Sequence, residues 1–263
     1  SDRVADMRTL PKGIDQRSAC RHPDWTGPDD LAIKITELRE ITQWRVPIFV
    51  KIAGARPYYD TTLAVKAGAD VVVLDGMQGG TAATQEVFIE NVGQPTLACI
   101  RPAVDALQDL NMHRQVQLII SGGIRNGADV AKAIALGADA VSIGTAAMIA
   151  IGDNDPKWNN EYKELGSEAG AYDDWHEGND PAGITTQNPK LMKRLDPIKA
   201  GKKLSNYLKV MTLEAQTITR ACGKNDLHNL EPEDLCALTV ESAAMARVPL
   251  SGTNWIPGNT MYE

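Results

Sequence analysis

Glycine-rich segments directly follow two successive apolar runs of this 263-residue chain, and they are the first candidates for binding chemistry. The run 116–120 leads into Ser121-Gly122-Gly123 and then Arg125, and the run 139–143 leads into Gly144-Thr145. Glycine lets backbone N–H groups approach an anion without a Cβ in the way. Because neighbouring strand ends can offer such groups to one phosphate, the spacing predicts a shared phosphate site. Plain turn glycines are the alternative.

A third glycine-rich segment follows another apolar run. Asp75 ends that run, and the segment 76–84 begins with three glycines within five residues. Binding residues gather on loops of this kind, which rigid elements hold in place. We therefore interpret the segment as a loop over a ligand, with a plain surface loop as the alternative.

Lys51 lies near the end of an otherwise apolar run, 46–52. An isolated buried ammonium group is costly, so Lys51 needs either an ion-pair partner or a bound ligand. Arg56 and Arg101 follow predicted elements and are suited to bind a substrate carboxylate through paired N–H groups. Solvated surface arginines are an equally good interpretation of both.

Composition and charge exclude several other classes of protein. A net charge of −7 argues against a nucleic-acid or acidic-membrane partner. No window of 18 apolar residues exists for a membrane-spanning helix, and Ser1–Val4 lacks the apolar region of a secretory signal. Cys20, Cys99, Cys222 and Cys236 are too far apart for a zinc ribbon or a disulfide framework. We therefore expect reduced thiols in a cytoplasmic protein.

Four short apolar runs are predicted to be buried parallel strands, because such runs between helices are typical of α/β sheets. They span 46–52, 70–75, 116–121 and 139–144. A fifth strand is expected at 13–19, and residues 151–263 show helical and irregular patterns only. The tetrapeptides 67–70 and 136–139 share Gly-Ala-Asp before a strand, which favours repeated βα units.

The order of these motifs resembles the FMN-binding barrel domain of the glutamate synthase family. The matching motifs are Val50-Lys51, 76–81, 121–123 and 144–147, and the resemblance covers about 13–249. Further on, the segment 180–189 resembles the one that closes the iron–sulfur region of that family.

The resemblance implies an FMN cofactor and gives roles to residues of this chain. Lys51 would stabilise negative charge on reduced flavin and so take part in catalysis. Arg56 and Gln78 would bind the substrate. The residues expected to bind the cofactor are Lys51, Gly79, Gly80, Thr81, Ser121, Gly122, Gly123, Arg125, Gly144 and Thr145.

The same resemblance implies the fold and the division of the chain. Residues 1–150 would be the C-terminal part of an FMN-binding (β/α)8 TIM barrel, about strands 4–8, with 13–19 as strand 4. Strands 1–3 would then precede Ser1. Residues 151–195 would be the former iron–sulfur region, and 196–263 a helical extension that packs on the barrel.

The chain departs from the family at its iron–sulfur region. The family usually has three cysteines there, but Trp175 and Asp180 stand where the middle and last ones would be. No cysteine lies between Cys99 and Cys222. Because thiolates hold such clusters, we predict no iron–sulfur cluster in this chain.

Within the family, the stretch 171–176 and the tail 252–258 resemble the glutamate-synthase-like subunit of N-methylglutamate synthase, or methylamine–glutamate N-methyltransferase. This implies FMN-dependent exchange of the amino group of glutamate for methylamine, which releases ammonia and forms N-methylglutamate. Partners would be amidotransferase-like and other glutamate-synthase-like subunits.

Two alternatives stay open. A glutamate synthase would reduce 2-iminoglutarate with electrons from a partner subunit, and dependence on a reductant would identify it. A non-catalytic assembly subunit would keep the fold without the cofactor. The glycines kept in all three segments argue against that second alternative.

Overall fold

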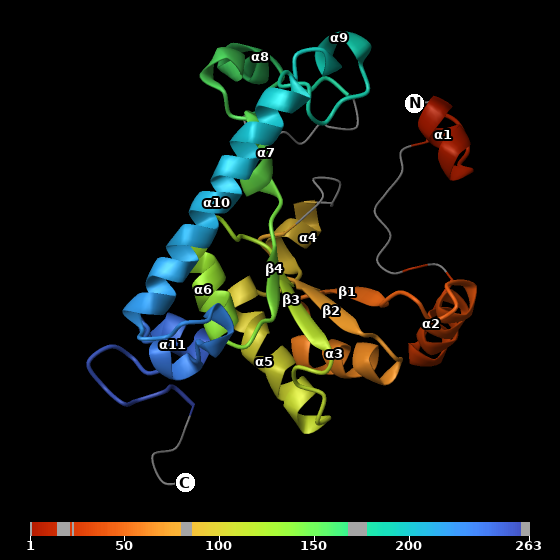
Figure 1. Ribbon diagram of the computed structural model, residues 1–263. Coiled ribbons are helices and arrows are strands. Elements are labelled where there is room, and N and C mark those ends of the chain that lie inside the picture. Colours follow the sequence, from red (N-terminus) through yellow and green to blue (C-terminus); the bar gives the residue numbers. More distant parts are fainter. Residues whose placement is uncertain (1, 15–21, 23, 80–85, 168–177, 259–263) are drawn as a thin grey trace.

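The computed structural model describes residues 2–14, 22, 24–79, 86–167 and 178–258 (Figure 1). Its strands are β1 (Phe49–Ala53), β2 (Val71–Asp75), β3 (Gln117–Ser121) and β4 (Ala140–Ser142). The helices up to β4 are α1 (Asp2–Arg8), α2 (Pro28–Ile41), α3 (Pro57–Lys66), α4 (Glu86–Asn91), α5 (Thr96–Asp109) and α6 (Gly127–Ala135). The later α-helices are α7 (Thr145–Ile151), α8 (Asn159–Glu164), α9 (Pro189–Met192), α10 (Pro197–Ala221) and α11 (Val240–Ala246).

The four strands form one parallel sheet in the order β1-β2-β3-β4. At least one helix joins each strand to the next, so successive βα units are added side by side. The predicted α/β class is confirmed, and this arrangement is that of one part of the wall of a (β/α)8 barrel.

Three predicted strands differ from the structure in detail. The first begins at Phe49 rather than at Val46, because Pro47 has no N–H group for the sheet. The last is shorter than predicted, with only Ala140–Ser142 paired to β3. Of the strand predicted at 13–19, Gly13 and Ile14 lie outside any strand, and 15–19 lie outside the described residues.

One face of the sheet forms the main core. Val72, Leu74, Leu118 and Ile120 are fully buried there, in a cluster with apolar side chains of α5. Alternate strand residues face the other way, and their side chains, except that of the buried Val71, are half-buried or exposed. The covered face therefore holds the sheet rigid, while the other face and the strand ends stay accessible.

The repeated Gly-Ala-Asp tetrapeptides form the same structure twice. Gly68 and Gly137 end α3 and α6 with φ of +102° and +111°, a conformation that favours glycine. Asp70 Oδ2 then accepts a hydrogen bond from Ile48 N at 2.7 Å. Asp139 Oδ2 accepts one from Leu118 N at 2.8 Å. Each aspartate thereby fixes the start of the neighbouring strand, which explains the repeat.

The 25-residue helix α10 packs along α6 and α7 (Figure 1). Asp196 caps it by accepting hydrogen bonds from Ile198 N and Lys199 N. Glu214 Oε2 accepts a hydrogen bond from Gly127 N at 2.8 Å, and a Cβ at Gly127 would come within 2.3 Å of the α10 backbone. The long helix therefore supports the segment that leads from β3 into α6.

Candidate functional site

The carboxyl ends of the four strands lie side by side. Ala53 pairs with Asp75, Asp75 with Ser121, and Ser121 with Ser142. The backbone continues this alignment beyond the strands, because Gly54 N donates to Asp75 O at 2.7 Å and Gly76 N donates to Ser121 O at 2.9 Å. The segments that the sequence singled out therefore leave the sheet at one edge.

Lys51 and Asp75 form an ion pair at this edge. Lys51 Nζ lies 2.8 Å from Asp75 Oδ2, and the lysine side chain is 60% exposed. Asp75 Oδ1 is buried and accepts no hydrogen bond from any described residue. A Cβ at Gly79 would come within 2.2 Å of this oxygen, so the loop after β2 closes tightly over the carboxylate. The lysine thus has the ion-pair partner that the sequence left open, and it also stays accessible to a ligand.

Sequence reasoning did not select Asp75 as a site residue. Its signal is an acidic residue at the end of a buried apolar run and directly before a glycine. Carboxylates at the carboxyl end of parallel strands often belong to sites. The pairing of Asp75 with a lysine one strand away is a contact between strands, which the sequence alone does not reveal.

Gln78 and Thr96 join the loop after β2 to the start of α5. Thr96 N donates to Gln78 Oε1 at 2.8 Å. The Thr96 hydroxyl lies 2.9 Å from both Gln78 Oε1 and Gly122 O. The Thr96 side chain is buried, and sequence reasoning missed it because it follows no strand.

Three glycines at this edge have conformational or packing reasons to be glycine. Gly122 and Gly123 have φ of +106° and +76°. A Cβ at Gly122 would lie 2.8 Å from Thr96 Oγ1, and one at Gly76 would lie 2.0 Å from the same atom. Tight packing therefore accounts for these residues without a ligand.

Gly144 is different, because packing does not require glycine there. Its φ is −126° and its ψ is −90°, and a Cβ would meet no atom within 4 Å. It stands directly before Thr145, the exposed first residue of α7. A glycine with free space beside it at a strand end is the expected feature of a backbone that a ligand approaches.

Arg101 lies within α5 and donates to Leu136 O at 3.2 Å, whereas the other two predicted arginines are paired with carboxylates four residues further on. Arg56 lies 2.9 Å from Asp60, and Arg125 lies 3.2 Å from Asp129. Both guanidinium groups are largely exposed, so a ligand can compete for them. The predicted cofactor residues Gly80 and Thr81 lie outside the described residues.

Cys99 is a structural residue beneath this edge. Its buried thiol lies 3.7 Å from the carbonyl oxygens of Gly54 and Gln94. A Cβ at Gly54 would come within 2.7 Å of the sulfur. Burial raises the pKa of the Cys99 thiol to about 11, so it is neutral at pH 7 and unsuited to act as a nucleophile.

A second buried polar cluster lies between α8 and α9. Asp180 is 1% exposed and accepts hydrogen bonds from the backbone N–H groups of Ala182, Ile184 and Thr185. Its Oδ1 also accepts a hydrogen bond from the Tyr162 hydroxyl at 2.9 Å. Burial, together with this carboxylate, raises the pKa of Tyr162.

This donor set does not fit an iron–sulfur cluster. Both carboxylate oxygens of Asp180 are occupied as hydrogen-bond acceptors, whereas a cluster needs thiolates. The described cysteines, Cys99, Cys222 and Cys236, are separate free thiols, and no three metal-ligating side chains come together within the described part of the chain. Trp175 lies outside the described residues, and the absence of a cluster stays a prediction.

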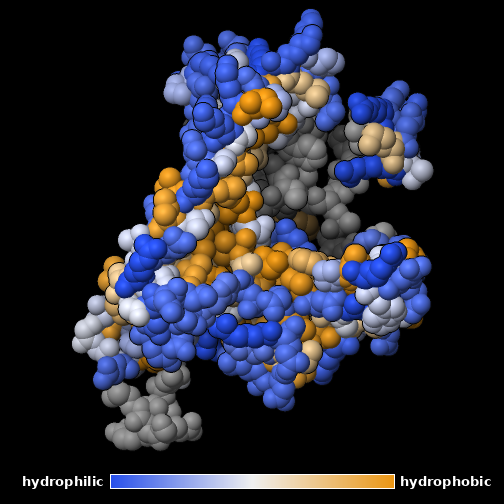
Figure 2. Space-filling view, viewed as in Figure 1, coloured by the Kyte–Doolittle hydropathy of each residue, from blue (hydrophilic) through white to orange (hydrophobic). Residues whose placement is uncertain are grey.

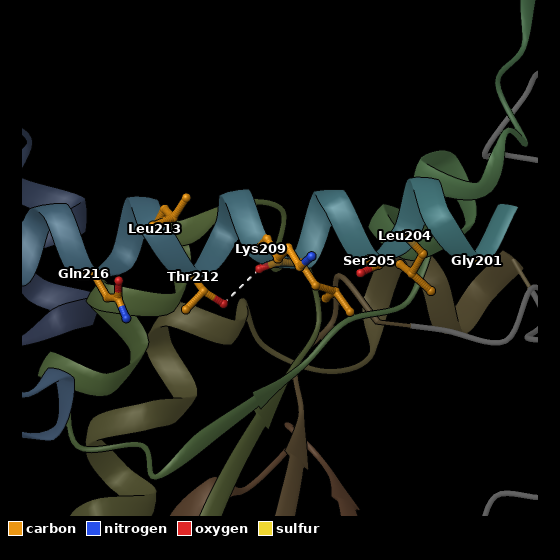
Figure 3. Close-up of a pocket in the computed structure, with 8 residues that line it drawn as sticks. Gly201, Leu204, Ser205, Lys209, Thr212, Leu213 and Gln216 are labelled. Atoms are coloured by element: carbon orange, nitrogen blue, oxygen red, sulfur yellow. Dashed lines mark hydrogen bonds between the residues drawn. The ribbon is translucent and has the colours of Figure 1, made fainter. Parts of the chain in front are cut away.

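A surface hollow lies along one side of α10. Figure 2 shows apolar side chains gathered over α10, and Figure 3 shows the residues that line the hollow. None of them is a predicted site residue. They are Gly201, Leu204, Ser205, Leu208, Lys209, Thr212, Leu213 and Gln216.

No helix among the described residues is long and apolar enough to cross a membrane.

The chain matches the family model described as the conserved region in glutamate synthase over residues 1–156 and 171–225. A "glutamate synthase large subunit-like protein" of Rhizobium meliloti is 82% identical over the whole chain, which covers 59% of that protein. An "archaeal glutamate synthase [NADPH]" of Methanocaldococcus jannaschii is 38% identical over 86% of the chain and 42% of that protein.

Among solved structures, the flavin-binding domain of baker's yeast flavocytochrome b2 is similar with a TM-score of 0.49 and 20% identity. The alignment covers 88% of this chain and 41% of that one. The chain thus spans about half the length of the curated relatives described above.

Proposed function

The chain belongs to the glutamate synthase family, and on that basis we propose that it is part of an FMN enzyme that exchanges the amino group of glutamate. The more specific proposal is the synthesis of N-methylglutamate from glutamate and methylamine, with release of ammonia. The observation that supports the site is the accessible Lys51, paired with Asp75, in a sheet whose strands end at the same edge as the segment that begins at Gly144.

The residues at this edge fit an FMN cofactor. The Lys51 ammonium supplies a positive charge, and the space beside Gly144 allows close approach to the backbone. The predicted holders are Lys51, Gly79, Ser121, Gly122, Gly123, Arg125, Gly144 and Thr145, together with Gly80 and Thr81. When bound, FMN supplies reversible acceptance of two electrons from a C–N bond.

The chain's own residues then have distinct tasks. Lys51 stabilises negative charge at the cofactor, and Asp75 orients the lysine through the 2.8 Å ion pair. Arg56 exchanges its contact with Asp60 for a carboxylate of glutamate. Gln78 binds the substrate from the loop after β2.

The proposed reaction needs no external electrons. Oxidation of the Cα–N bond of glutamate to an imine removes two electrons, and methylamine then adds to the imine carbon while ammonia leaves. Return of the same two electrons, with the two protons given up in the oxidation, gives N-methylglutamate. This redox-neutral sequence is consistent with an iron–sulfur region in which Asp180 replaces a cysteine.

An anaerobic absorbance titration of the assembled enzyme that contains this chain tests the proposal. Glutamate alone should bleach the flavin bands, methylamine should restore them, and N-methylglutamate should accumulate without an added donor. A flavin that stays oxidised in glutamate would contradict the mechanism.

Glutamate synthase activity is the second candidate, and the relative named "archaeal glutamate synthase [NADPH]" favours it. In that case, electrons from a partner subunit would reduce 2-iminoglutarate, and turnover would require a reductant. An assembly that contains no flavin would instead indicate a non-catalytic subunit.

A further inference from the structure

The orientation of the Gln78 amide is fixed by the backbone of α5. A backbone N–H can only donate, so the Gln78 atom that lies 2.8 Å from Thr96 N must be the amide oxygen. The amide nitrogen, with its two donors, then points away from Thr96. It makes no hydrogen bond to any described residue, and the Gln78 side chain is exposed.

Thr96 is held so tightly that it can set this orientation. A Cβ at Gly76 would lie 2.5 Å from Thr96 Cα, and one at Gly122 would lie 2.8 Å from its Oγ1. The Thr96 side chain is therefore enclosed between the loops after β2 and β3. Gln78 in turn lies over Gly123, where a Cβ would be 3.1 Å from Gln78 Cβ.

We propose that Thr96 is a positioning residue that fixes Gln78 with its NH2 group toward the ligand, so that Gln78 donates hydrogen bonds to a carboxylate. This proposal rests on the proposed function and names the chemical group that Gln78 recognises. The hydroxyl of Thr96 donates its single proton to Gln78 Oε1 or to Gly122 O, both at 2.9 Å. Thr96 therefore lies in contact with both the loop after β2, through Gln78, and the loop after β3, through Gly122.

Glutarate is the probe for the test, because this five-carbon dicarboxylate has no amino group and cannot be oxidised to an imine. Its binding to the assembled enzyme is measured by calorimetry, so the result does not depend on turnover. Gln78→Glu keeps both acceptor contacts to Thr96 but replaces the donors with a negative charge. We expect glutarate to bind at least about tenfold more weakly to this variant.

The matched control is Gln115→Glu. Gln115 lies before β3, at the opposite end of that strand, and its Nε2 donates to Asn111 O at 3.0 Å. This control makes the same change of charge and should leave glutarate binding unchanged. Equal affinity for glutarate in the wild type and Gln78→Glu would overturn the donor role of Gln78.

Two variants test Thr96 itself. Thr96→Val removes the hydroxyl at nearly constant volume and leaves only the Thr96 N–H to hold Gln78 Oε1, so it should weaken glutarate binding about three- to tenfold, while Thr96→Ser should restore it. In turnover, Thr96→Val should raise KM for glutamate more than it lowers kcat. Weak binding in both variants, or normal binding in both, would contradict the positioning role.

The flavin-to-protein ratio separates this proposal from the proposed function. It should stay at the wild-type value in all four variants, because none of the three side chains that they change is assigned to the cofactor. A loss of flavin in Gln78→Glu, with normal glutarate affinity, would show that the donors serve the cofactor and would overturn the proposal. If the variants change the affinity for glutarate as expected, but glutamate does not bleach the flavin of the wild-type enzyme, only the amino-exchange reaction is overturned.

Discussion

Asp180→Asn is expected to destabilise the protein strongly, although the two side chains have nearly the same shape. The wild-type carboxylate accepts three backbone N–H groups, from Ala182, Ile184 and Thr185, and the Tyr162 hydroxyl. An amide offers only one oxygen. If that oxygen replaces Oδ2, it keeps the two 2.7 Å bonds from Ile184 N and Thr185 N.

The new NH2 group then faces another donor, Ala182 N. Tyr162 can rotate its proton toward Asp153, which lies 3.2 Å away, but the Ala182 N–H loses its acceptor. An unpaired buried donor costs about 1–3 kcal/mol. Loss of the charge weakens the two retained bonds by roughly 1 kcal/mol each. The sum is about 3–5 kcal/mol, which corresponds to a fall in Tm of roughly 6–20 °C.

Urea unfolding of the purified protein measures this free energy, and hydrogen exchange of the peptides from 180–189 shows whether the loss is local. The control is Asp196→Asn. Asp196 also accepts two backbone N–H groups, but at the exposed start of α10, where asparagine caps as well as aspartate. We expect a change below about 0.5 kcal/mol there. An Asp180→Asn variant as stable as this control would refute the reasoning.

Three further predictions concern the sheet and its ends. Gly76→Ala places a Cβ 2.5 Å from Thr96 Cα and should lower the Tm. Gly201→Ala lies in open space within α10 and should raise the Tm slightly, because alanine favours the helix more than glycine does. Thermal unfolding of both variants checks this. Because the pKa of Cys99 in the folded protein is about 11, the contribution of this thiol to stability should be lost as pH rises from about 9 to about 11. Urea unfolding of the wild type and Cys99→Ala at a series of pH values measures this loss of free energy. The hydrogen bond from Arg39 lowers the pKa of Asp70, so its stabilisation is present above the unfolded pKa of about 4 and is lost on acidification. Asp70→Asn should therefore flatten the acid limb of the stability curve.

The sequence predicted the sheet well because local signals were sufficient. Continuous apolar runs located all four described strands, and the Gly-Ala-Asp repeat indicated equivalent βα units. The ends of elements were less certain, since Pro47 shortens β1 and pairing to β3 limits β4 to three residues. The helix α1 at Asp2–Arg8 was not expected, because its short segment has no strong apolar pattern.

The site was predicted only where its residues follow strands. Lys51, Gly122 and Gly144 come to one edge because parallel strands end together. Asp75 and Thr96 were missed, since their roles depend on partners that are distant in sequence. A pattern read along the chain does not show which side chains meet across the sheet.

The glycines explain why one sequence signal can have two physical origins. Gly76 and Gly122 enclose Thr96, and a Cβ at either position would come closer than 3.0 Å to its side chain. These residues would be glycine even in a protein without a cofactor, because the loops could not otherwise close on that side chain. Gly144 has no such neighbour within 4 Å, so packing gives no reason for glycine there. Among these three, Gly144 therefore carries the most weight for a ligand, although the sequence presents all of them as equivalent strand-end glycines.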